Sequence, residues 1–273
     1  MYSRAYVEIT NICNLHCSFC HGHSRKPRQM GREEFLHILS QLEGQTKYIY
    51  YHLMGEPLLH PQFPELIVLA GQRGFSSVIT TNGTLLHQKG QALLDAGVHK
   101  VSISLHSFEQ DDTAAQRQYL SQVADFAQQA AARGTLVSLR LWNRGCDQGR
   151  NRETEAFLRS LLPGPWAENT RGYRLRDKLF LEYGDRFGWP DIENPEQSGK
   201  RVCYGMRDHF GILSDGTVVP CCLDSDGVIA LGNVFSQPLA QILTSERAQR
   251  IAAGFAAHTA CEALCRRCPY ATR

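Results

Sequence analysis

Three cysteines lie within eight residues near the start of the chain, in the segment CNLHCSFC (13–20). Cys13, Cys17 and Cys20 follow one another at intervals of four and three positions. A structural zinc site takes four ligands, usually from CxxC pairs. A 4Fe–4S cluster can take three thiolates and leave its fourth iron to an outside ligand. The spacing therefore favours an iron–sulfur cluster, with zinc as the alternative.

A second group of cysteines lies after residue 200. Its members are Cys203, Cys221, Cys222, Cys261, Cys265 and Cys268. Four thiolates are enough for a fully cysteine-ligated cluster, and they are also enough for a structural zinc ion. The remaining cysteine, Cys146, is expected to be an uninvolved loop thiol.

Strand-like and helical patterns alternate through the first 183 residues. The strands and helices that they predict must position these cysteines. The expected strands are 4–10, 47–53, 76–83, 100–106, 136–142 and 173–183. The expected helices are 32–43, 63–74, 91–97, 114–134 and 152–162. This alternation predicts an α/β fold with a parallel sheet and right-handed crossovers. A closed eight-fold barrel needs about 250 residues, so a partial (β/α)6 TIM-like barrel fits better.

The runner-up fold is an open doubly wound sheet, although no GxGxxG motif follows the first strand. Three parts are expected along the chain. Residues 1–183 form the barrel, and 184–200, rich in Gly, Pro, Asp, Glu and Asn, form a linker. Residues 201–273 form a small cysteine-rich module, which we expect a metal centre to staple because so short a segment has little core of its own.

The first cysteine group directly follows the first strand, at the barrel end where such folds place active sites. CNLHCSFC resembles the CxxxCxxC signature of the radical S-adenosylmethionine (SAM) enzymes, including an aromatic residue, Phe19, before the last cysteine. The resemblance implies that Cys13, Cys17 and Cys20 hold a 4Fe–4S cluster whose open iron binds SAM. It also implies reductive cleavage of SAM to a 5'-deoxyadenosyl radical, which abstracts a hydrogen atom from the substrate.

Two further segments extend the resemblance. MGEPLLHP (54–61) is similar to the GGEP segment that holds the methionyl amine of SAM: Gly55, Glu56 and Pro57 match, and Met54 replaces the first glycine. ITTNG (79–83) resembles the TNG turn of the family and implies that Thr81 and Asn82 contact SAM.

The fourth and fifth strands each add one residue. Ser104 matches the position of a SAM-contacting serine in related enzymes. Arg140 is expected to pair with the methionyl carboxylate, because a guanidinium can donate two parallel hydrogen bonds to it. An ordinary ion pair at the barrel mouth is the alternative for Arg140.

The second cysteine group also carries a resemblance. The run from Cys203 through Gly216 to Cys221 resembles the CxnGx4C opening of the SPASM and twitch extensions, which bind auxiliary 4Fe–4S clusters. SDGTVVP (214–220) is expected to form a β-hairpin with Asp215–Gly216 as its turn. The resemblance implies one auxiliary cluster of the twitch type. Its implied ligands are Cys203, Cys221, Cys265 and Cys268.

Alternatives remain open within this set. Adjacent residues of a strand point to opposite faces, so only one of Cys221 and Cys222 should face the cluster. Cys261 begins a CxxxCxxC run and could replace Cys265.

Composition limits the partners. The chain has 273 residues and a formal net charge of +2, which gives no reason to expect nucleic acid or an anionic membrane as a partner. No signal peptide and no apolar run of membrane-spanning length is present. Clustered cysteines then indicate metal ligands in a reducing compartment, which we expect to be the cytoplasm.

The sequence thus predicts a radical SAM enzyme that acts on a small molecule or a peptide, with the auxiliary cluster assisting electron transfer. A flavodoxin- or ferredoxin-type protein is the expected electron donor. The alternatives are a radical SAM enzyme that modifies RNA and a non-catalytic iron–sulfur or zinc protein.

Overall fold

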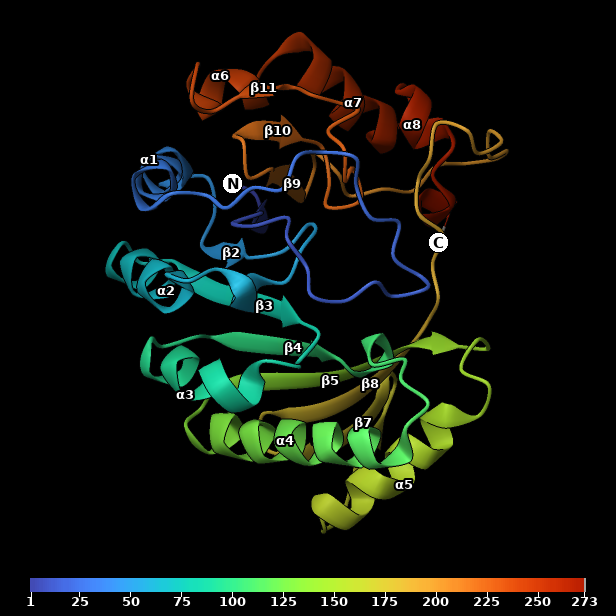
Figure 1. The fold of residues 1–273 in the computed structure, drawn as a ribbon. Coiled ribbons are helices and arrows are strands. Elements are labelled where there is room, and N and C mark those ends of the chain that lie inside the picture. The colour runs from blue at the N-terminus through green and yellow to red at the C-terminus, as the bar shows by residue number, and fades with distance from the viewer. Residues whose placement is uncertain (273) are drawn as a thin grey trace.

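The computed structural model describes residues 1–272 as one mixed sheet of eleven strands with helices packed on it (Figure 1). The strand order across the sheet is β11-β10-β9-β1-β2-β3-β4-β5-β8-β7-β6. Its central strands, which pair in parallel, are β1 (Arg4–Val7), β2 (Tyr48–Tyr50), β3 (Ser76–Thr81), β4 (Lys100–Ser104), β5 (Leu136–Arg144) and β8 (Leu179–Asp185).

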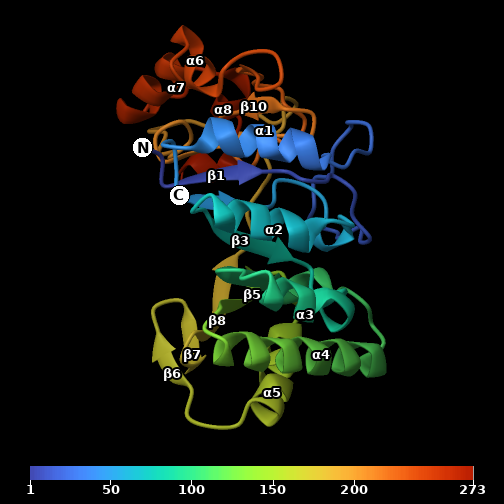
Figure 2. The same ribbon diagram turned by 90° about the vertical axis from the view of Figure 1, so that its left-hand side faces the viewer.

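Each of the first five strands leads to a crossover helix. These helices are α1 (Arg32–Leu42), α2 (Phe63–Gln72), α3 (Leu86–Asp95), α4 (Thr113–Ala132) and α5 (Arg150–Leu161). Figure 2 shows α1 to α4 stacked in front of the strands. The predicted partial barrel is therefore confirmed, with a parallel run of strands whose helices cover one face.

The core lies between that face and the helices. Helix α1 buries Phe35, Ile38 and Leu39 on one side, as a period of 3.6 residues requires. Val101 and Ile103 of β4 join the same buried cluster. Residues of one parity along each strand thus form the apolar layer, and residues of the other parity point away from it.

The predicted strand 173–183 is wrong as a single element. A turn at Asp177–Lys178 divides it into β7 (Gly172–Arg176) and β8, which pair antiparallel. Lys178 adopts a positive φ of 59°, which reverses the chain there. The third strand β6 (Ala167–Asn169) completes this edge of the sheet.

The C-terminal segment continues the sheet rather than standing apart from it. Strand β9 (His209–Ile212) pairs in parallel with β1, and β10 (Thr217–Val219) and β11 (Gly232–Asn233) follow antiparallel. The predicted hairpin with its Asp215–Gly216 turn is confirmed, with Gly216 at φ +86°. Short helices finish the chain: α6 (Leu239–Leu243), α7 (Glu246–Ala256) and α8 (Ala263–Arg266).

Helices α6 and α7 bury Ile242, Ile251 and Phe255 in the same core cluster as the barrel. The C-terminal segment therefore shares the main core. The boundaries 1–183, 184–200 and 201–273 stay a prediction. Among residues 1–272, none of the helices combines the length and apolar character that crossing a bilayer requires.

One buried carboxylate connects three parts of this fold. Glu8, just after β1, has a side chain with 0% exposure and accepts hydrogen bonds from Arg25 Nη1 and Nη2 at 2.8 and 2.6 Å. It also accepts from the Met54 backbone N–H at 3.3 Å. Ser214 donates to it through its N–H at 3.1 Å and its hydroxyl at 2.9 Å.

We expect Glu8→Gln to lower the free energy of unfolding by about 3–5 kcal/mol, because it leaves the mostly buried Arg25 without its counter-ion. Urea denaturation followed by circular dichroism measures this. Glu33→Gln is the matched control: Glu33 pairs with Arg32 at a site where its side chain is 82% exposed. The control should change stability by less than about 1 kcal/mol. Equal losses in both variants would contradict this role of Glu8.

Candidate active site

The first three cysteines lie in the loop between β1 and α1. Both ends of this loop are fixed by Asn11, whose side chain donates to Lys26 O at 2.9 Å and accepts from the Arg28 N–H at 2.7 Å. Cys13 and Cys20 are exposed, and Cys17 is half-buried with its thiol 3.6 Å from Ser107 O, beyond the end of β4. The loop thus lies over the carboxyl ends of the parallel strands.

The surroundings of these thiols favour a metal centre over free thiolates. Burial raises the pKa of Cys17 to about 11, and the charges of Glu109, Cys13 and Cys20 add to the rise. Burial also raises the pKa of Cys13, and the charges of Glu56 and Cys20 add to that rise. Thiols with raised pKa values, such as those of Cys13 and Cys17, stay protonated until a cation replaces the protons. The thiols of the cysteine loop therefore fit an iron–sulfur cluster.

The GEP segment approaches this loop closely. Gly55 has φ +77°, and a Cβ there would lie 2.4 Å from the Thr10 carbonyl oxygen, so only glycine fits. The next N–H, of Glu56, donates to Ile12 O at 2.9 Å. The segment after β2 and the start of the cysteine loop are therefore held together backbone to backbone.

Glu56 points into the protein. Its carboxylate accepts hydrogen bonds from Thr81 Oγ1 at 2.7 Å, the Asn82 N–H at 2.8 Å and the Leu58 N–H at 3.1 Å. Burial raises the pKa of Glu56, and the three donors oppose that rise. The structure thus brings the predicted residues Glu56, Thr81 and Asn82 into direct contact. Their contacts with SAM stay a prediction.

Asn82 connects this group to the cysteine loop. Its side chain donates to Asn14 Oδ1 at 2.9 Å and accepts from Thr84 Oγ1 at 2.7 Å, while Asn14 donates to Thr84 at 2.9 Å. Asn14 is the residue after Cys13. Asn14 and Thr84 were not among the predicted site residues. Their one signal was their position, next to the cysteine and the TNG turn.

Ser104 and Arg140 are direct partners in the register of β4 and β5. The Arg140 guanidinium lies 4.4 Å from the ring centroid of Trp142. Among residues 1–272 it has no hydrogen-bond or ion-pair partner, and its Nε is buried. Glu182 of β8 is its register partner on the other side. A guanidinium without a hydrogen-bond or ion-pair partner can bind an anionic ligand. Arg140 therefore fits the methionyl carboxylate of SAM.

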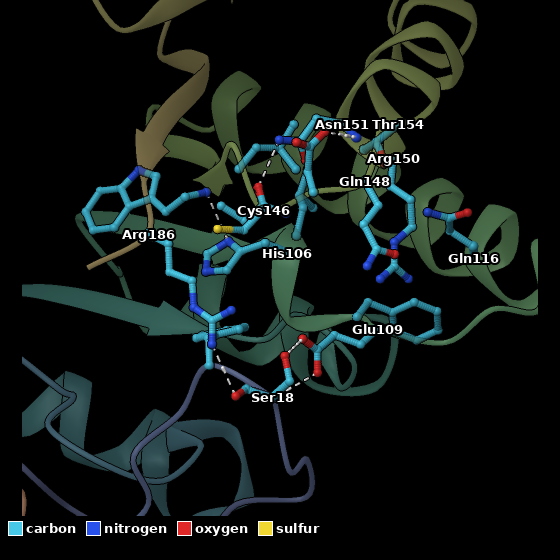
Figure 3. A pocket seen from close by; sticks show the side chains of 17 residues that line it. Ser18, His106, Glu109, Gln116, Cys146, Gln148, Arg150, Asn151, Thr154 and Arg186 are labelled. Atoms are coloured by element: carbon cyan, nitrogen blue, oxygen red, sulfur yellow. Dashed lines mark hydrogen bonds between the residues drawn. The ribbon is translucent and has the colours of Figure 1, made fainter. Parts of the chain in front are cut away.

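A pocket of about 190 Å³ opens beside the cysteine loop (Figure 3). Phe19 lines it, with its ring 4.9 Å from that of His106. Glu109 closes one side, where it accepts from the Ser18 N–H at 2.7 Å and from the Ser18 hydroxyl at 2.6 Å. Trp142 also lines the pocket. Aromatic rings next to a cluster loop offer a stacking surface for a base such as adenine.

The second cysteine set gathers around β9 and β10. Burial raises the pKa of Cys221, and the charges of Cys222, Cys203 and Cys265 add to the rise. Burial also raises the pKa of Cys265, together with the charges of Cys203 and Cys268. Arg201 is buried and donates to Cys265 O at 3.1 Å and to Cys268 O. These four thiols therefore share one neighbourhood, which contains a buried cation.

Cys222 and Cys261 lie differently. Cys222 packs against a small cluster of Tyr6, Leu53, Leu213 and Val219, and its thiol interacts with the Tyr6 hydroxyl. The Cys261 thiol donates to Arg250 O of α7 at 3.2 Å. The Cys261 thiol thus contacts α7, whereas Cys222 contacts Tyr6 and also lies within electrostatic reach of Cys221 and Cys203. In the part of the chain described, no three His, Cys, Asp or Glu side chains stand close enough to share one metal ion.

Family models match two parts of the chain. The radical SAM superfamily model matches residues 7–140, and the SPASM model, described as an iron–sulfur cluster-binding domain, matches residues 203–269. Together they span more than two thirds of the chain.

Curated relatives match only in part. A tungsten-containing aldehyde ferredoxin oxidoreductase cofactor-modifying protein from Pyrococcus furiosus is 37% identical over 105 residues, which is 37% of this chain and 30% of the relative. A GTP 3',8-cyclase from Chlorobaculum tepidum is 34% identical over 109 residues, 38% of this chain and 33% of the relative. The chain therefore spans about a third of the length of these relatives.

Solved structures match over nearly the whole fold. BtrN in complex with AdoMet and 2-DOIA aligns with a TM-score of 0.65 and 17% identity, over 98% of this chain and 93% of that one. anSMEcpe with bound AdoMet and Cp18Cys peptide aligns with a TM-score of 0.62 and 14% identity, over 90% and 81% of the two chains. At these identities the likeness shows the fold.

The fold, the two cysteine groups and the two matching models give one conclusion. This chain belongs to the radical SAM superfamily, as an enzyme that uses SAM and iron–sulfur clusters and carries a C-terminal SPASM-type domain.

Proposed function

We propose that this enzyme cleaves SAM reductively at a 4Fe–4S cluster held by Cys13, Cys17 and Cys20 and removes a hydrogen atom from its substrate. When bound, the cluster and SAM supply a one-electron cleavage that yields an organic radical. The observation that carries the proposal is the contact of the cysteine loop with the ends of β2, β3 and β4, through Gly55, Asn82 and Ser107.

The chain's own residues then bind and orient SAM. Arg140 and Ser104 are proposed to hold the methionyl carboxylate, because the guanidinium has no hydrogen-bond or ion-pair partner among residues 1–272. The Gly55–Pro57 backbone and Glu56 are proposed to receive the amine. Phe19, at the pocket wall, is proposed to contact the adenine. Glu56 follows β2, Ser104 ends β4 and Arg140 is the register partner of Ser104 on β5, while Phe19 lies in the cysteine loop.

We further propose that Cys203, Cys221, Cys265 and Cys268 hold one auxiliary 4Fe–4S cluster that assists electron transfer. The contacts of Cys222 with Tyr6 and of Cys261 with α7 support their exclusion from the ligand set. A flavodoxin- or ferredoxin-type protein is the proposed electron donor. All ten cysteines are free thiols, which supports a reducing compartment such as the cytoplasm.

The proposed substrate is a small molecule or a peptide. Solved structures of similar fold hold 2-DOIA in one case and a peptide in another. A formal net charge of only +2 favours these classes over RNA.

The main test is SAM cleavage. Anaerobic incubation of the reconstituted enzyme with SAM and dithionite should yield 5'-deoxyadenosine, detected by chromatography. Cys17→Ala should abolish this product while about four irons per chain remain in the second cluster. Cys261→Ala, the control, should keep both the product and the full iron load. A Cys17→Ala enzyme that still forms 5'-deoxyadenosine would remove the basis of the proposal.

The neighbouring cysteines 221 and 222 provide a second test. Cys221→Ala should lower iron and sulfide toward about four of each per chain, and Cys268→Ala should do the same. Cys222→Ala should keep the full load, because its thiol contacts Tyr6 instead. Iron and sulfide analysis of the anaerobically reconstituted variants measures this. If Cys222→Ala lowered the iron and sulfide content and Cys221→Ala did not, Cys222 and not Cys221 would be the cluster ligand.

A further inference from the structure

Arg201 is a deeply buried cation beside the second cysteine group. Its exposure is 4%, and no other arginine or lysine of residues 1–272 is as buried. Its backbone N–H donates to His258 O at 2.9 Å, and the next N–H, of Val202, donates to Ala271 O at 2.7 Å. The backbone at Arg201 is therefore fixed to the chain both before and after the Cys265–Cys268 stretch.

The guanidinium of Arg201 has no carboxylate partner. Its Nη2 donates to two carbonyl oxygens, that of Cys265 at 3.1 Å and that of Cys268. Its Nε and Nη1 are buried and have no hydrogen-bond partner among residues 1–272, and the group forms no ion pair with a carboxylate there. Carbonyl oxygens carry only partial negative charge, and a buried cation is costly unless an anion compensates it. The fold thus keeps a full positive charge beside the backbone of two proposed ligands.

The charge of Arg201 also reaches the thiols. Burial raises the pKa of Cys203 and of Cys268, and the Arg201 cation opposes both rises because it stabilises a thiolate. With the carbonyl of Cys265, three of the four proposed ligands of the auxiliary cluster are in contact with one guanidinium or within its electrostatic reach.

Two carboxylates and a second cation also face this site. After burial and the neighbouring thiols, Glu262 and Asp224 add to the raised pKa of Cys265. Glu262 is paired with Arg247, whose Nε and Nη2 donate to its two oxygens at 2.9 and 2.8 Å. The Asp224 carboxylate accepts from two backbone N–H groups of its own loop, both at 2.8 Å. Both carboxylates therefore have donors of their own, and neither forms an ion pair with Arg201.

We propose that Arg201 is the counter-charge of the auxiliary cluster and raises its reduction potential, so that the cluster takes up an electron more readily. The inference rests on the proposed function, which assigns Cys203, Cys221, Cys265 and Cys268 to that cluster. A 4Fe–4S cluster with four thiolates carries a net negative charge, and reduction adds to it. A fixed cation nearby therefore stabilises the reduced cluster more than the oxidised one. Arg201 needs no contact with iron or sulfide for this, because a charge acts over several ångströms in a buried site.

The test measures the reduction potential of the auxiliary cluster alone. Cys17→Ala enzyme is the background, because we expect it to hold that cluster and no other. Film voltammetry of the anaerobically reconstituted protein gives the potential, with the electrode as the source of the electron. Arg201→Gln keeps a donor for the carbonyls but removes the charge. It should lower the equilibrium constant for one-electron reduction at least about tenfold, which shifts the potential by about 60 mV to more negative values.

Three further variants complete the series. Arg201→Met is a second neutral variant and should shift the potential in the same direction. Arg201→Lys keeps the charge and should reverse most of the shift. Arg176→Gln, at an exposed arginine on β7 near the opposite edge of the sheet, is the control and should leave the potential unchanged.

Iron analysis separates this role from a structural one, because Arg201→Gln should still hold about four irons per chain. An unchanged potential in the neutral variants, or an equal shift in Arg201→Lys, overturns the inference. Loss of iron from both neutral variants also overturns it, since Arg201 would then serve the assembly of the site. If the potential does not respond to Arg201 while the wild type forms 5'-deoxyadenosine, only this inference fails. If Cys17→Ala enzyme holds no cluster at all, the proposed ligand set fails and this inference with it.

Discussion

The structure depends on the buried carboxylate of Glu8. It joins the loop of the first cysteines through Arg25, the end of β2 through Met54 and the C-terminal segment through Ser214. A carboxylate with no exposed surface is costly unless charged and polar donors surround it. These donors come from segments distant in sequence, so the carboxylate is stabilised only when the cysteine loop, the GEP segment and the β9–β10 hairpin are all in place. The segments that carry the two cysteine groups are thereby connected through one buried carboxylate.

Local patterns in the sequence account for much of this architecture. The alternation of strands with helices such as α1, whose buried residues recur every three or four positions, predicted the partial barrel. The antiparallel pairing of β7 with β8 was missed because Asp177–Lys178 lacks a glycine to mark the turn, and the parallel pairing of β9 with β1 has no local signal at all. Pairing between segments some 200 residues apart is decided by the whole fold.

The face of the sheet opposite the helices shows a different limit. In KVSIS, the alternation of apolar and polar residues correctly indicates a strand with one buried face. The usual interpretation sends the polar side to solvent, and the serines then carry no information. In the structure Ser102 is fully buried, and the polar side faces the barrel interior next to Arg140. The pairing of β4 with β5 places this ordinary pattern inside the barrel, so the serines are buried instead of exposed to solvent.

Glu56 shows how hydrogen bonds within the fold can order a residue for which a role in binding is proposed. An ionised carboxylate offers about four lone-pair sites. Thr81, Asn82 and Leu58 occupy three of them, so the side chain is fixed before any ligand arrives. About one site remains for a further donor, such as the amine of SAM. The same hydrogen bonds that connect the segments after β2 and β3 therefore orient the remaining lone pair, and a ligand bound there would lose no entropy in ordering this acceptor.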